Sequence, residues 1–249
     1  MITFYSVVKG FDDPHIATIQ RNAACALLWS YPEAQVIWFG EDEPGALEAA
    51  NLYGIPLYPM KRNEYGAPLL PSVIEKAHEV ARFDIRCLVN ADILLPQNFG
   101  QAVETIAEEF ASFLFISRRV GVAVDWRIDF SPTWFVDIAA LDRKKYTPSA
   151  IDFFCYRGGW LRNVPQFGIG RSAWDNWIVG TAKQAKIPIV DGTQFVKAFH
   201  QEHEKQRRPK QMARNRALFK AEIKGSGDLT EATHRLTKDG NVEKGKVHK

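Results

Sequence analysis

Leu88-Val89-Asn90-Ala91-Asp92-Ile93-Leu94-Leu95-Pro96 is the most informative segment of the sequence. An apolar strand, expected over residues 85–90, runs directly into Asn-x-Asp and is followed by a second apolar stretch. A carboxylate at the C-terminal edge of a central strand can bind a divalent cation, because hard oxygen ligands suit Mg²⁺ and Mn²⁺. The alternative interpretation is an Asx turn at a strand end. These residues by themselves leave both interpretations open.

On both sides of this segment, short apolar strands alternate with helices of roughly 10–15 residues. We expect further strands over residues 2–8, 35–39, 55–58 and 112–116. We expect helices over residues 72–81 and 98–110, and another that begins after the N-cap Asp13 with Pro14 in its first turn. Ser72-Val-Ile-Glu75 has the spacing of a capping box. This alternation predicts an α/β fold with one mostly parallel central sheet, whose ligand lies beyond the carboxyl ends of its strands.

The second half of the chain has a less regular pattern. A helix is expected over residues 173–186, and Arg157-Gly-Gly-Trp-Leu-Arg162 is expected to form a loop. Short strands are expected over residues 134–139, 152–156, 187–190 and 194–199.

Composition indicates a globular protein. The chain has 249 residues, of which 46% are hydrophobic and 24% charged, and a chain of this length can bury a full core. It contains no run of about 18 apolar residues, and Met1-Ile2-Thr3-Phe4-Tyr5 is expected to open the first strand instead of a signal peptide. The cysteines Cys25, Cys87 and Cys155 form no CxxC pair. We therefore expect buried thiols in the cytoplasm and no cysteine-ligated zinc.

Charge is distributed unevenly along the chain. Residues 201–249 contain 13 Lys/Arg and 7 Asp/Glu, whereas the preceding residues contain 19 and 22. We therefore expect a compact domain over residues 1–204 and a basic C-terminal extension over residues 205–249.

The Asn90-Ala91-Asp92 segment resembles the DxD motif of the GT-A class of nucleotide-sugar glycosyltransferases, with Asn in place of the first Asp. The resemblance covers roughly residues 2–204 and implies a donor site at this sheet edge. It implies that the compact domain is catalytic, with a nucleotide-binding half over about residues 1–110 and an acceptor half over about residues 111–204. It also implies that the loop after the first strand flanks the nucleoside, and that an acidic residue after the second strand contacts the base or ribose. A segment similar to Asn63-Glu64-Tyr65-Gly66-Ala67-Pro68 occurs in related bacterial proteins. The donor-binding residues implied here are Val7, Lys9, Asp42, Asn63, Glu64, Gly66, Asn90 and Ala91.

The segment from Phe167 to Trp177 contains two glycines directly before an expected helix. In inverting enzymes of this class, a carboxylate at such a helix start deprotonates the acceptor hydroxyl, which implies that Asp175 is the catalytic base. The alternative is that Asp175 only caps the helix, because Ser172-x-x-Asp175 has capping-box spacing. Trp174 or Trp177 can stack on a sugar or belong to the core. Gly170, Trp174 and Asn176 complete the implied donor-binding residues of this segment.

Histidines follow the last expected core strand, at His200 and His203. A histidine at this place supplies a metal ligand in many GT-A enzymes, so the resemblance implies that Asp92 and His203, or alternatively His200, bind Mn²⁺ or Mg²⁺. A pair of histidines at a strand end can instead be simply solvated. If imidazole binds the metal it must be neutral, and activity should then fall below about pH 6.

Arginines are the remaining candidates for diphosphate binding. Arg118 and Arg119 follow the strand expected over residues 112–116, and Arg171 precedes the helix over 173–186. A guanidinium binds diphosphate through bidentate hydrogen bonds, and the alternative for each is a surface arginine. We assign Arg118 to the donor site.

Together these features predict a metal-dependent glycosyltransferase that moves a sugar from a nucleotide-diphosphate donor to a glycan or glycoconjugate acceptor. The resemblance places such a reaction in polysaccharide or glycoconjugate synthesis. A nucleotidyltransferase is disfavoured because Val7–Asp13 is not a Gly-rich phosphate loop, and neither GxGxxG nor GxxxxGK[ST] occurs. The basic extension leaves open a non-catalytic module that binds nucleic acid or an anionic surface, or a peripheral membrane contact of the enzyme. We expect no nucleic-acid partner.

Overall fold

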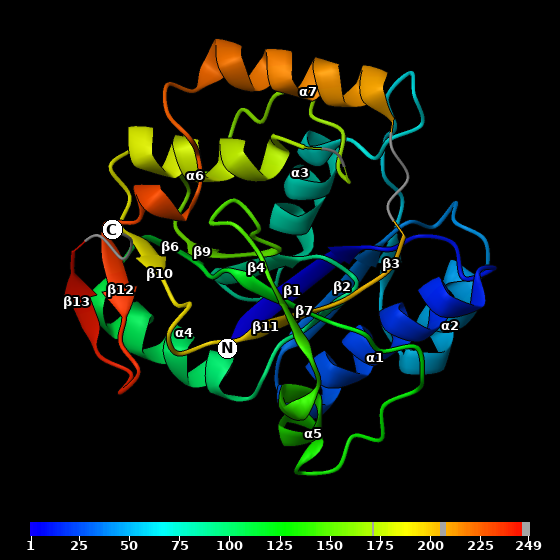
Figure 1. The fold of residues 1–249 in the computed structure, drawn as a ribbon. Coiled ribbons are helices and arrows are strands. Elements are labelled where there is room, and N and C mark those ends of the chain that lie inside the picture. The colour runs from blue at the N-terminus through cyan, green and yellow to red at the C-terminus, as the bar shows by residue number, and fades with distance from the viewer. Residues whose placement is uncertain (171, 205–207, 246–249) are drawn as a thin grey trace.

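The computed structural model describes residues 1–170, 172–204 and 208–245. Its centre is a nine-stranded sheet, whose strands are β1 (Ile2–Val7), β2 (Gln35–Phe39), β3 (Leu57–Tyr58), β4 (Ile85–Val89), β6 (Phe113–Ile116), β9 (Phe153–Arg157), β10 (Ile189–Asp191), β12 (His234–Leu236) and β13 (Val242–Lys244). They are arranged in the order β13-β12-β10-β6-β9-β4-β1-β2-β3 (Figure 1). Neighbouring strands are parallel, except that β9 is antiparallel to β4 and β6, and β13 is antiparallel to β12.

A second, smaller sheet lies at the carboxyl end of β4. It has the order β5-β11-β7-β8, and its strands are β5 (Ile93–Leu94), β7 (Arg119–Val122), β8 (Arg143–Lys145) and β11 (Ala198–Gln201). The predicted α/β class with a mostly parallel central sheet is therefore confirmed, but the expectation of a single sheet did not include this second one. The small sheet matters for function because its strands carry side chains back to the end of β4.

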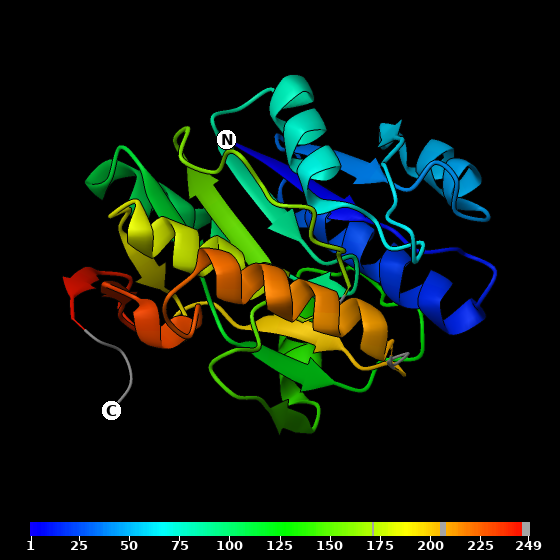
Figure 2. The same ribbon diagram turned by 90° about the horizontal axis from the view of Figure 1, so that it is seen from above.

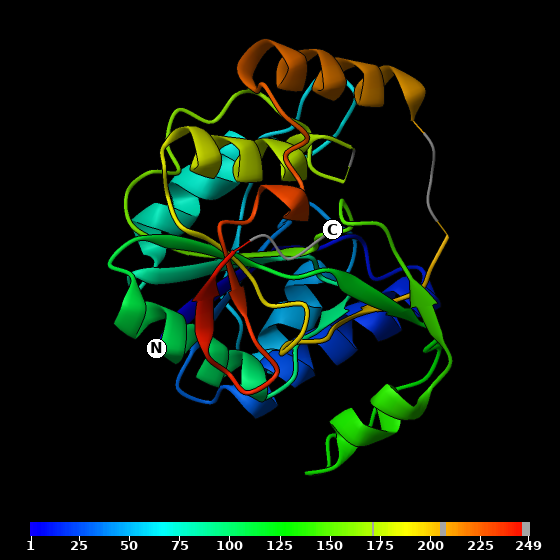
Figure 3. The ribbon, with the colours of Figure 1, turned by 60° about the vertical axis from the view of Figure 1, so that its left-hand side comes forward.

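Helices cover both faces of the large sheet (Figures 1 and 2). One face packs against α1 (Pro14–Ser30), α2 (Ala46–Tyr53) and α4 (Asn98–Glu109). The other packs against α3 (Leu70–Val80) and α6 (Trp174–Gln184), and α7 (Pro209–Glu222) lies over α6. Helix α5 (Trp134–Ala140) packs beside the small sheet and stands apart from the large one (Figure 3).

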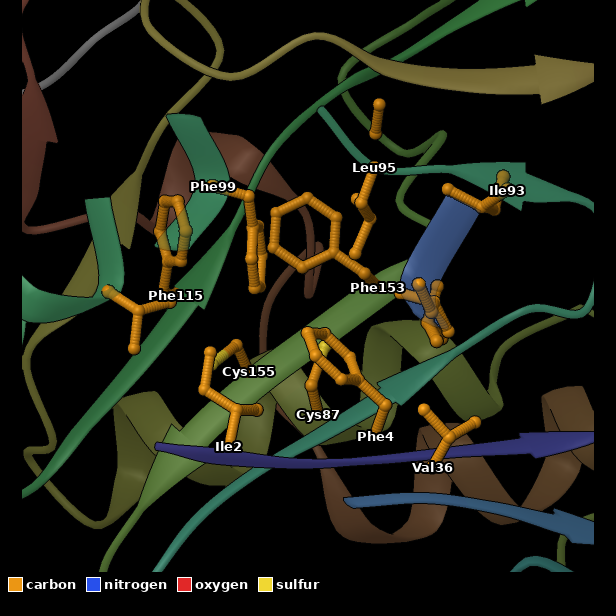
Figure 4. Packing of buried hydrophobic residues seen from close by; sticks show 14 of the residues in the cluster. Ile2, Phe4, Val36, Cys87, Ile93, Leu95, Phe99, Phe115, Phe153 and Cys155 are labelled. Atoms are coloured by element: carbon orange, nitrogen blue, oxygen red, sulfur yellow. The ribbon is translucent and has the colours of Figure 1, made fainter. Parts of the chain in front are cut away.

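An aromatic cluster fills the core between the large sheet and α4. Phe99 of α4 points at the sheet residues Phe4, Phe115 and Phe153 (Figure 4), with ring centroids 5.8, 5.5 and 5.2 Å away. All four side chains are fully buried. Burying several aromatic rings supplies much of the hydrophobic stabilisation that holds α4 against β1, β6 and β9.

Helix starts confirm one capping prediction and correct another. The Asp13 side chain accepts hydrogen bonds from the backbone N–H groups of His15 and Ile16, at 2.9 and 3.1 Å, so it is the N-cap of α1 as predicted. The predicted capping box at Ser72 is wrong, because α3 begins two residues earlier, at Leu70. The Ser72 hydroxyl lies inside the helix and donates to the Leu69 carbonyl at 2.9 Å.

Two strand predictions in the second half also need correction. Residues 134–139 form helix α5 instead of a strand, since Trp134 and Ile138 lie four residues apart and are both buried against the small sheet. Their aromatic and branched neighbours suggested a strand. The strand expected over 194–199 begins only at Ala198, because residues 192–196 form a turn in which the Val196 N–H donates to the Gly192 carbonyl.

The described part of residues 205–249 contacts helix α6 and also adds strands to the large sheet. Helix α7 packs on α6, the short 3₁₀ helix η1 (Leu229–Glu231) contacts α6, and β12 pairs in parallel with β10. The η1 helix and the β12–β13 pair are therefore ordered parts of this region.

Cys87 and Cys155 are buried register partners on β4 and β9, Cys25 is half-buried, and all three cysteines are free. None of the described helices combines the length and apolarity needed to cross a bilayer.

Candidate functional site

The pairing of β5 with β11 brings Asp92 next to two histidines. Asp92 lies in the turn after β4, and the antiparallel register places Ile93 opposite His200. The Gln201 N–H also donates to the Asp92 carbonyl at 3.1 Å. His203 lies two residues after β11. Residues that are more than a hundred positions apart in the sequence thus meet at the carboxyl edge of the large sheet.

Asp92, His200 and His203 form a compact cluster. The Asp92 Oδ2 atom lies 3.0 Å from His203 Nε2 and 3.6 Å from His200 Nε2. One candidate ligand atom from each residue lies within 4.8 Å of the other two. The side chains are only 14%, 2% and 7% exposed for Asp92, His200 and His203 respectively. The metal-ligand pair predicted from the sequence, Asp92 and His203, is therefore in contact, and His200 joins it.

Hydrogen bonds orient both imidazole rings toward Asp92. The Nδ1 atom of His200 lies 2.9 Å from Glu202 Oε1, and Nδ1 of His203 lies 2.8 Å from the Glu204 carbonyl oxygen. These partners accept hydrogen bonds, so each Nδ1 carries a proton and each Nε2 faces Asp92. Without a metal, His203 Nε2 donates a hydrogen bond to the Asp92 carboxylate. Once both Nε2 atoms are deprotonated, they can offer their lone pairs to a cation beside this carboxylate.

The Asp92 carboxylate has a strongly perturbed environment. Burial acts to raise its pKa, but the hydrogen bond with His203 and the charges of His200 and Lys9 outweigh burial and lower the pKa to about 2. Its second oxygen, Oδ1, is buried and has no hydrogen-bond partner among the described residues. A carboxylate oxygen with spare acceptor capacity and two oriented imidazoles fit a divalent transition-metal ion.

Glu202 links the histidines to the small sheet. It accepts a hydrogen bond from the Tyr146 hydroxyl at 2.5 Å, and its other carboxylate oxygen lies 3.5 Å from Lys144 Nζ. Burial tends to raise its pKa, but the Tyr146 hydrogen bond and the charge of His200 lower it. Sequence reasoning missed Glu202 and Tyr146. Glu202 stands between the two histidines in the sequence, which was an available signal, whereas Tyr146 is brought in only by the β7–β8 pairing.

Asp152 is a second residue that the sequence analysis missed. It lies just before β9, is 6% exposed, and accepts hydrogen bonds from the Asn90 amide at 2.9 Å and from Arg119 Nη1 at 2.5 Å. The Arg119 guanidinium also lies over the Tyr146 ring, 4.3 Å from its centroid. The Asn90 amide N–H and the Arg119 charge thus hold Asp152 in place. Of the two alternatives that the sequence left open for Arg119, the surface arginine is wrong, since Arg119 pairs with a buried carboxylate.

Asp175 lies in the first turn of α6. Its Oδ1 accepts a hydrogen bond from the Asn176 backbone N–H at 2.9 Å, but no side chain caps the helix, whose N-cap is Ala173 with φ of +82°. The Ser172 hydroxyl is buried without a hydrogen-bond partner among the described residues, so Ser172 and Asp175 form no capping box. Burial, and then the charge of Asp152, raise the pKa of Asp175 to about 6, against the opposing effect of backbone N–H groups.

We expect Asp175 to lower stability at neutral pH, which a pure capping role would not do. A pKa near 6 in the folded state exceeds the unfolded value of about 3.9, so the folded state binds the proton more tightly. The stabilisation is fully present below about pH 4 and is lost as the pH rises through 6. We therefore compare the free energy of unfolding of Asp175→Asn with that of wild type at two pH values, by urea denaturation. The difference, variant minus wild type, should be about 2 kcal/mol larger at pH 7.5 than at pH 4.5.

The same comparison separates the two interpretations of Asp175. If its carboxylate mainly caps α6, the variant is less stable than wild type at pH 7.5, because the helix N-terminus favours a negative charge. A difference between the two proteins that stays constant across this pH range would contradict the raised pKa.

A second group of predicted residues gathers around Arg62. Its guanidinium lies 2.6 Å from Asp42 and 2.5 Å from Glu43, and it donates to the Gly66 carbonyl at 3.0 Å. Asn63 Oδ1 accepts hydrogen bonds from two backbone N–H groups of the same loop, and Gly66 has φ of +75°. Glu64 lies 3.4 Å from Arg214 of α7. The loop is therefore preformed, with Asp42 54% exposed beside it.

The remaining candidates divide into exposed, partly buried and fully buried positions. Lys9 and Gly170 are exposed, and the charge of Lys9 acts on Asp92. Four others are half-buried: Val7, Ala91, Arg118 and Asn176. Asn176 donates from its amide to the Gly227 carbonyl at 2.9 Å. The predicted sugar stacking of Trp174 or Trp177 is wrong, because their side chains are 4% and 3% exposed and pack in the core, Trp174 against Phe154. Arg171 lies outside the described residues.

The strand order and the helices on both faces of the large sheet are those of the GT-A fold. This fold is shared with solved structures of S. aureus TarS. The structure of TarS 1–349 in complex with UDP-GlcNAc matches 89% of this chain with a TM-score of 0.53 and 15% identity. A longer TarS structure matches 89% with a TM-score of 0.58 and 13% identity.

The matched region is only part of TarS. This chain spans 66% of the TarS 1–349 chain and 39% of the longer TarS chain. No protein-family model matches the sequence, and a search of curated proteins finds no match. At these identities the likeness to TarS establishes the fold.

Proposed function

We propose that this protein transfers a sugar from a nucleotide-diphosphate donor to an acceptor hydroxyl. The observation that carries the proposal is the convergence of the Asp92 carboxylate with the Nε2 atoms of His200 and His203 at the carboxyl edge of a GT-A sheet. Ligands of such sheets lie beyond the carboxyl ends of the strands. The complex of S. aureus TarS with UDP-GlcNAc supports a nucleotide-sugar donor for a protein of the same fold.

Asp92, His200 and His203 would hold the divalent cation, with Glu202 and the Glu204 carbonyl keeping the imidazoles in place. Two imidazoles with one carboxylate favour Mn²⁺ over Mg²⁺, which prefers oxygen ligands. When bound, the cation neutralises the donor diphosphate and acts as a Lewis acid toward the leaving group. Lys9, whose charge acts on Asp92, adds a cation for the same diphosphate.

The other side chains bind the donor and accept the proton. The loop that contains Asn63, Glu64 and Gly66, with Asp42 beside it, contacts the nucleoside together with Val7 at the end of β1. Asn90, Ala91, Arg118, Gly170 and Asn176 border the remainder of the donor site. Asp175 accepts the proton of the acceptor hydroxyl, since a pKa near 6 suits a general base at neutral pH. This role requires inversion at the sugar carbon.

The acceptor is proposed to be a glycan or glycoconjugate, in polysaccharide or glycoconjugate synthesis in the cytoplasm. We assign catalysis to residues 1–204, with residues 205–249 as a basic extension that can contact an anionic membrane surface. The excess of Lys and Arg in this extension supports such a contact.

A thermal-shift panel tests the proposal. UDP, GDP, CDP and TDP are each added with Mn²⁺, Mg²⁺ or EDTA. At a ligand concentration of 100 times Kd, binding should stabilise the protein by about 2.7 kcal/mol, and one nucleotide should do so with Mn²⁺ but not with EDTA. A shift that survives EDTA would overturn the metal assignment, and no shift with any nucleotide would overturn the transferase proposal.

A further inference from the structure

A polar cavity of about 580 Å³ lies at the opposite end of β4 and β9 from the Asp92 cluster. Asn90 follows β4 and Asp152 precedes the antiparallel β9, so both lie at the catalytic edge of the sheet. Arg86, near the start of β4, and Arg157, at the end of β9, lie at the other edge and line the cavity. The cavity is therefore separate from the proposed donor site.

The arginines of this cavity differ in how they are paired. Arg157 is fully engaged, because its guanidinium donates to the carbonyls of Ala107, Phe110 and Ala111 at the end of α4. Arg86 and Arg162 form no ion pair among the described residues, and the buried Nε of Arg86 has no hydrogen-bond partner there. A buried guanidinium donor without an acceptor is costly, which points to an anionic ligand.

The walls of the cavity leave this positive charge uncompensated. His78 Nε2 lies 2.9 Å from the Tyr156 hydroxyl, which lies 2.9 Å from the Tyr5 hydroxyl. Burial, and then the charges of Arg86 and Arg162, lower the pKa of His78 to about 4, so His78 is neutral at pH 7. Asp84 also lines the cavity. Its backbone carbonyl accepts a hydrogen bond from Arg86 Nη1 at 3.2 Å, but within the described chain its carboxylate makes no ion pair with either arginine.

The loop between β9 and Arg162 is built to place this arginine. A Cβ at Gly159 would lie 2.5 Å from Arg162 Nη2, so a side chain there would displace the guanidinium. Gly158 has φ of +100°, a conformation that favours glycine. The Arg157–Arg162 loop thus places the Arg162 guanidinium against Gly159 at the cavity, and the backbone of the loop favours glycine at position 158.

We propose that this cavity is a second ligand site, which binds the phosphoryl group of a small phosphorylated solute between Arg86 and Arg162. Guanidinium groups bind phosphate oxygens through paired, charge-assisted hydrogen bonds. A cavity of about 580 Å³ also has room for the organic group that carries the phosphate. A phosphate monoester therefore fits better than a bare anion.

Isothermal titration of the full chain with glucose 1-phosphate and with inorganic phosphate tests the site. EDTA is present throughout, so that the Asp92 cluster holds no metal. Wild type should bind glucose 1-phosphate, and Arg162→Gln and Arg86→Gln should each weaken binding about ten- to a hundredfold. Arg216→Gln is the matched control, because Arg216 is an exposed arginine on α7, away from the cavity. Its affinity should equal that of wild type.

A second measurement needs no variant of an arginine. The Trp160 indole N–H donates to the Arg157 carbonyl at 3.2 Å beside the cavity. Its ¹H–¹⁵N cross-peak, assigned with Trp160→Phe, should move as wild type is titrated with glucose 1-phosphate. No binding of either soluble phosphate, or binding that survives both arginine variants, would overturn the proposal. So would binding only to vesicles that contain phosphatidic acid. The titration is done with EDTA and does not depend on the donor site. A thermal-shift panel in which no nucleotide binds would therefore count against the proposed function but not against this second site.

Discussion

Asp92→Ala is expected to weaken Mn²⁺ binding by more than about 100-fold, because it removes the single carboxylate of the cluster and leaves two imidazoles as ligands. Metal-dependent binding of the nucleotide found by the thermal-shift panel should disappear with it. Titration of free Mn²⁺ followed by electron paramagnetic resonance measures the first effect. Thermal shift with and without Mn²⁺ measures the second.

Two further variants show whether Mn²⁺ affinity depends on the geometry of the Asp92 cluster and not only on the number of negative charges in the protein. Asp129→Ala removes an exposed carboxylate elsewhere and should leave Mn²⁺ affinity unchanged. Glu202→Gln keeps the ligands but changes the partner that orients His200, and should weaken Mn²⁺ binding by about 10- to 100-fold. Retention of tight Mn²⁺-dependent nucleotide binding by Asp92→Ala would refute the metal assignment.

Asp175→Asn is expected to lower turnover by about 10²- to 10⁴-fold while donor affinity stays unchanged, because the amide cannot accept the proton of the acceptor hydroxyl. The assay is release of the nucleoside diphosphate from its sugar donor. In wild type the rate should fall as the pH drops below about 6, where Asp175 becomes protonated. The part of this acidic limb that is due to Asp175 should be missing from the residual rate of the variant, whereas the part that is due to loss of metal from the imidazoles should remain.

Asp137→Asn is the matched control, since Asp137 is an exposed aspartate in the first turn of another helix, α5. Its turnover should equal that of wild type. Normal turnover of Asp175→Asn would show that no base acts at this position, as in an enzyme that retains configuration at the sugar carbon. Because Asp175→Asn is also expected to be stable at neutral pH, a loss of rate would not reflect unfolding.

The regular part of the fold could be predicted because its signals are local. Strand β2 occupies the predicted residues 35–39, and the Asp13-Pro14 pair begins α1 as expected. Helix α5 could not be predicted in this way, because Trp134 and Phe135 favour a strand by composition. Their burial against Phe199 of the small sheet decides for a helix. That contact joins segments more than 60 residues apart.

The site was predictable only where a residue is marked by its neighbours in sequence. Asp92 follows an apolar strand, and Asp175 begins a helix after two glycines, so both were identified. Whether His200 or His203 faces Asp92 depends on the β5–β11 register, which no local pattern fixes. Asp152 was missed for the same reason, since its partners Asn90 and Arg119 lie on strands distant in sequence.

Strand β12 is encoded near the C-terminal end of the sequence, far from its partner β10, and this has a consequence for biosynthesis. Strand β10 pairs with β6 on one side, and within the described ranges its other side is covered by β12, more than 40 residues further on. Until residues 234–236 have left the ribosome, the nascent chain presents an open strand edge, which can pair with other chains. A chain truncated before His234 should therefore depend on chaperones and accumulate as aggregate.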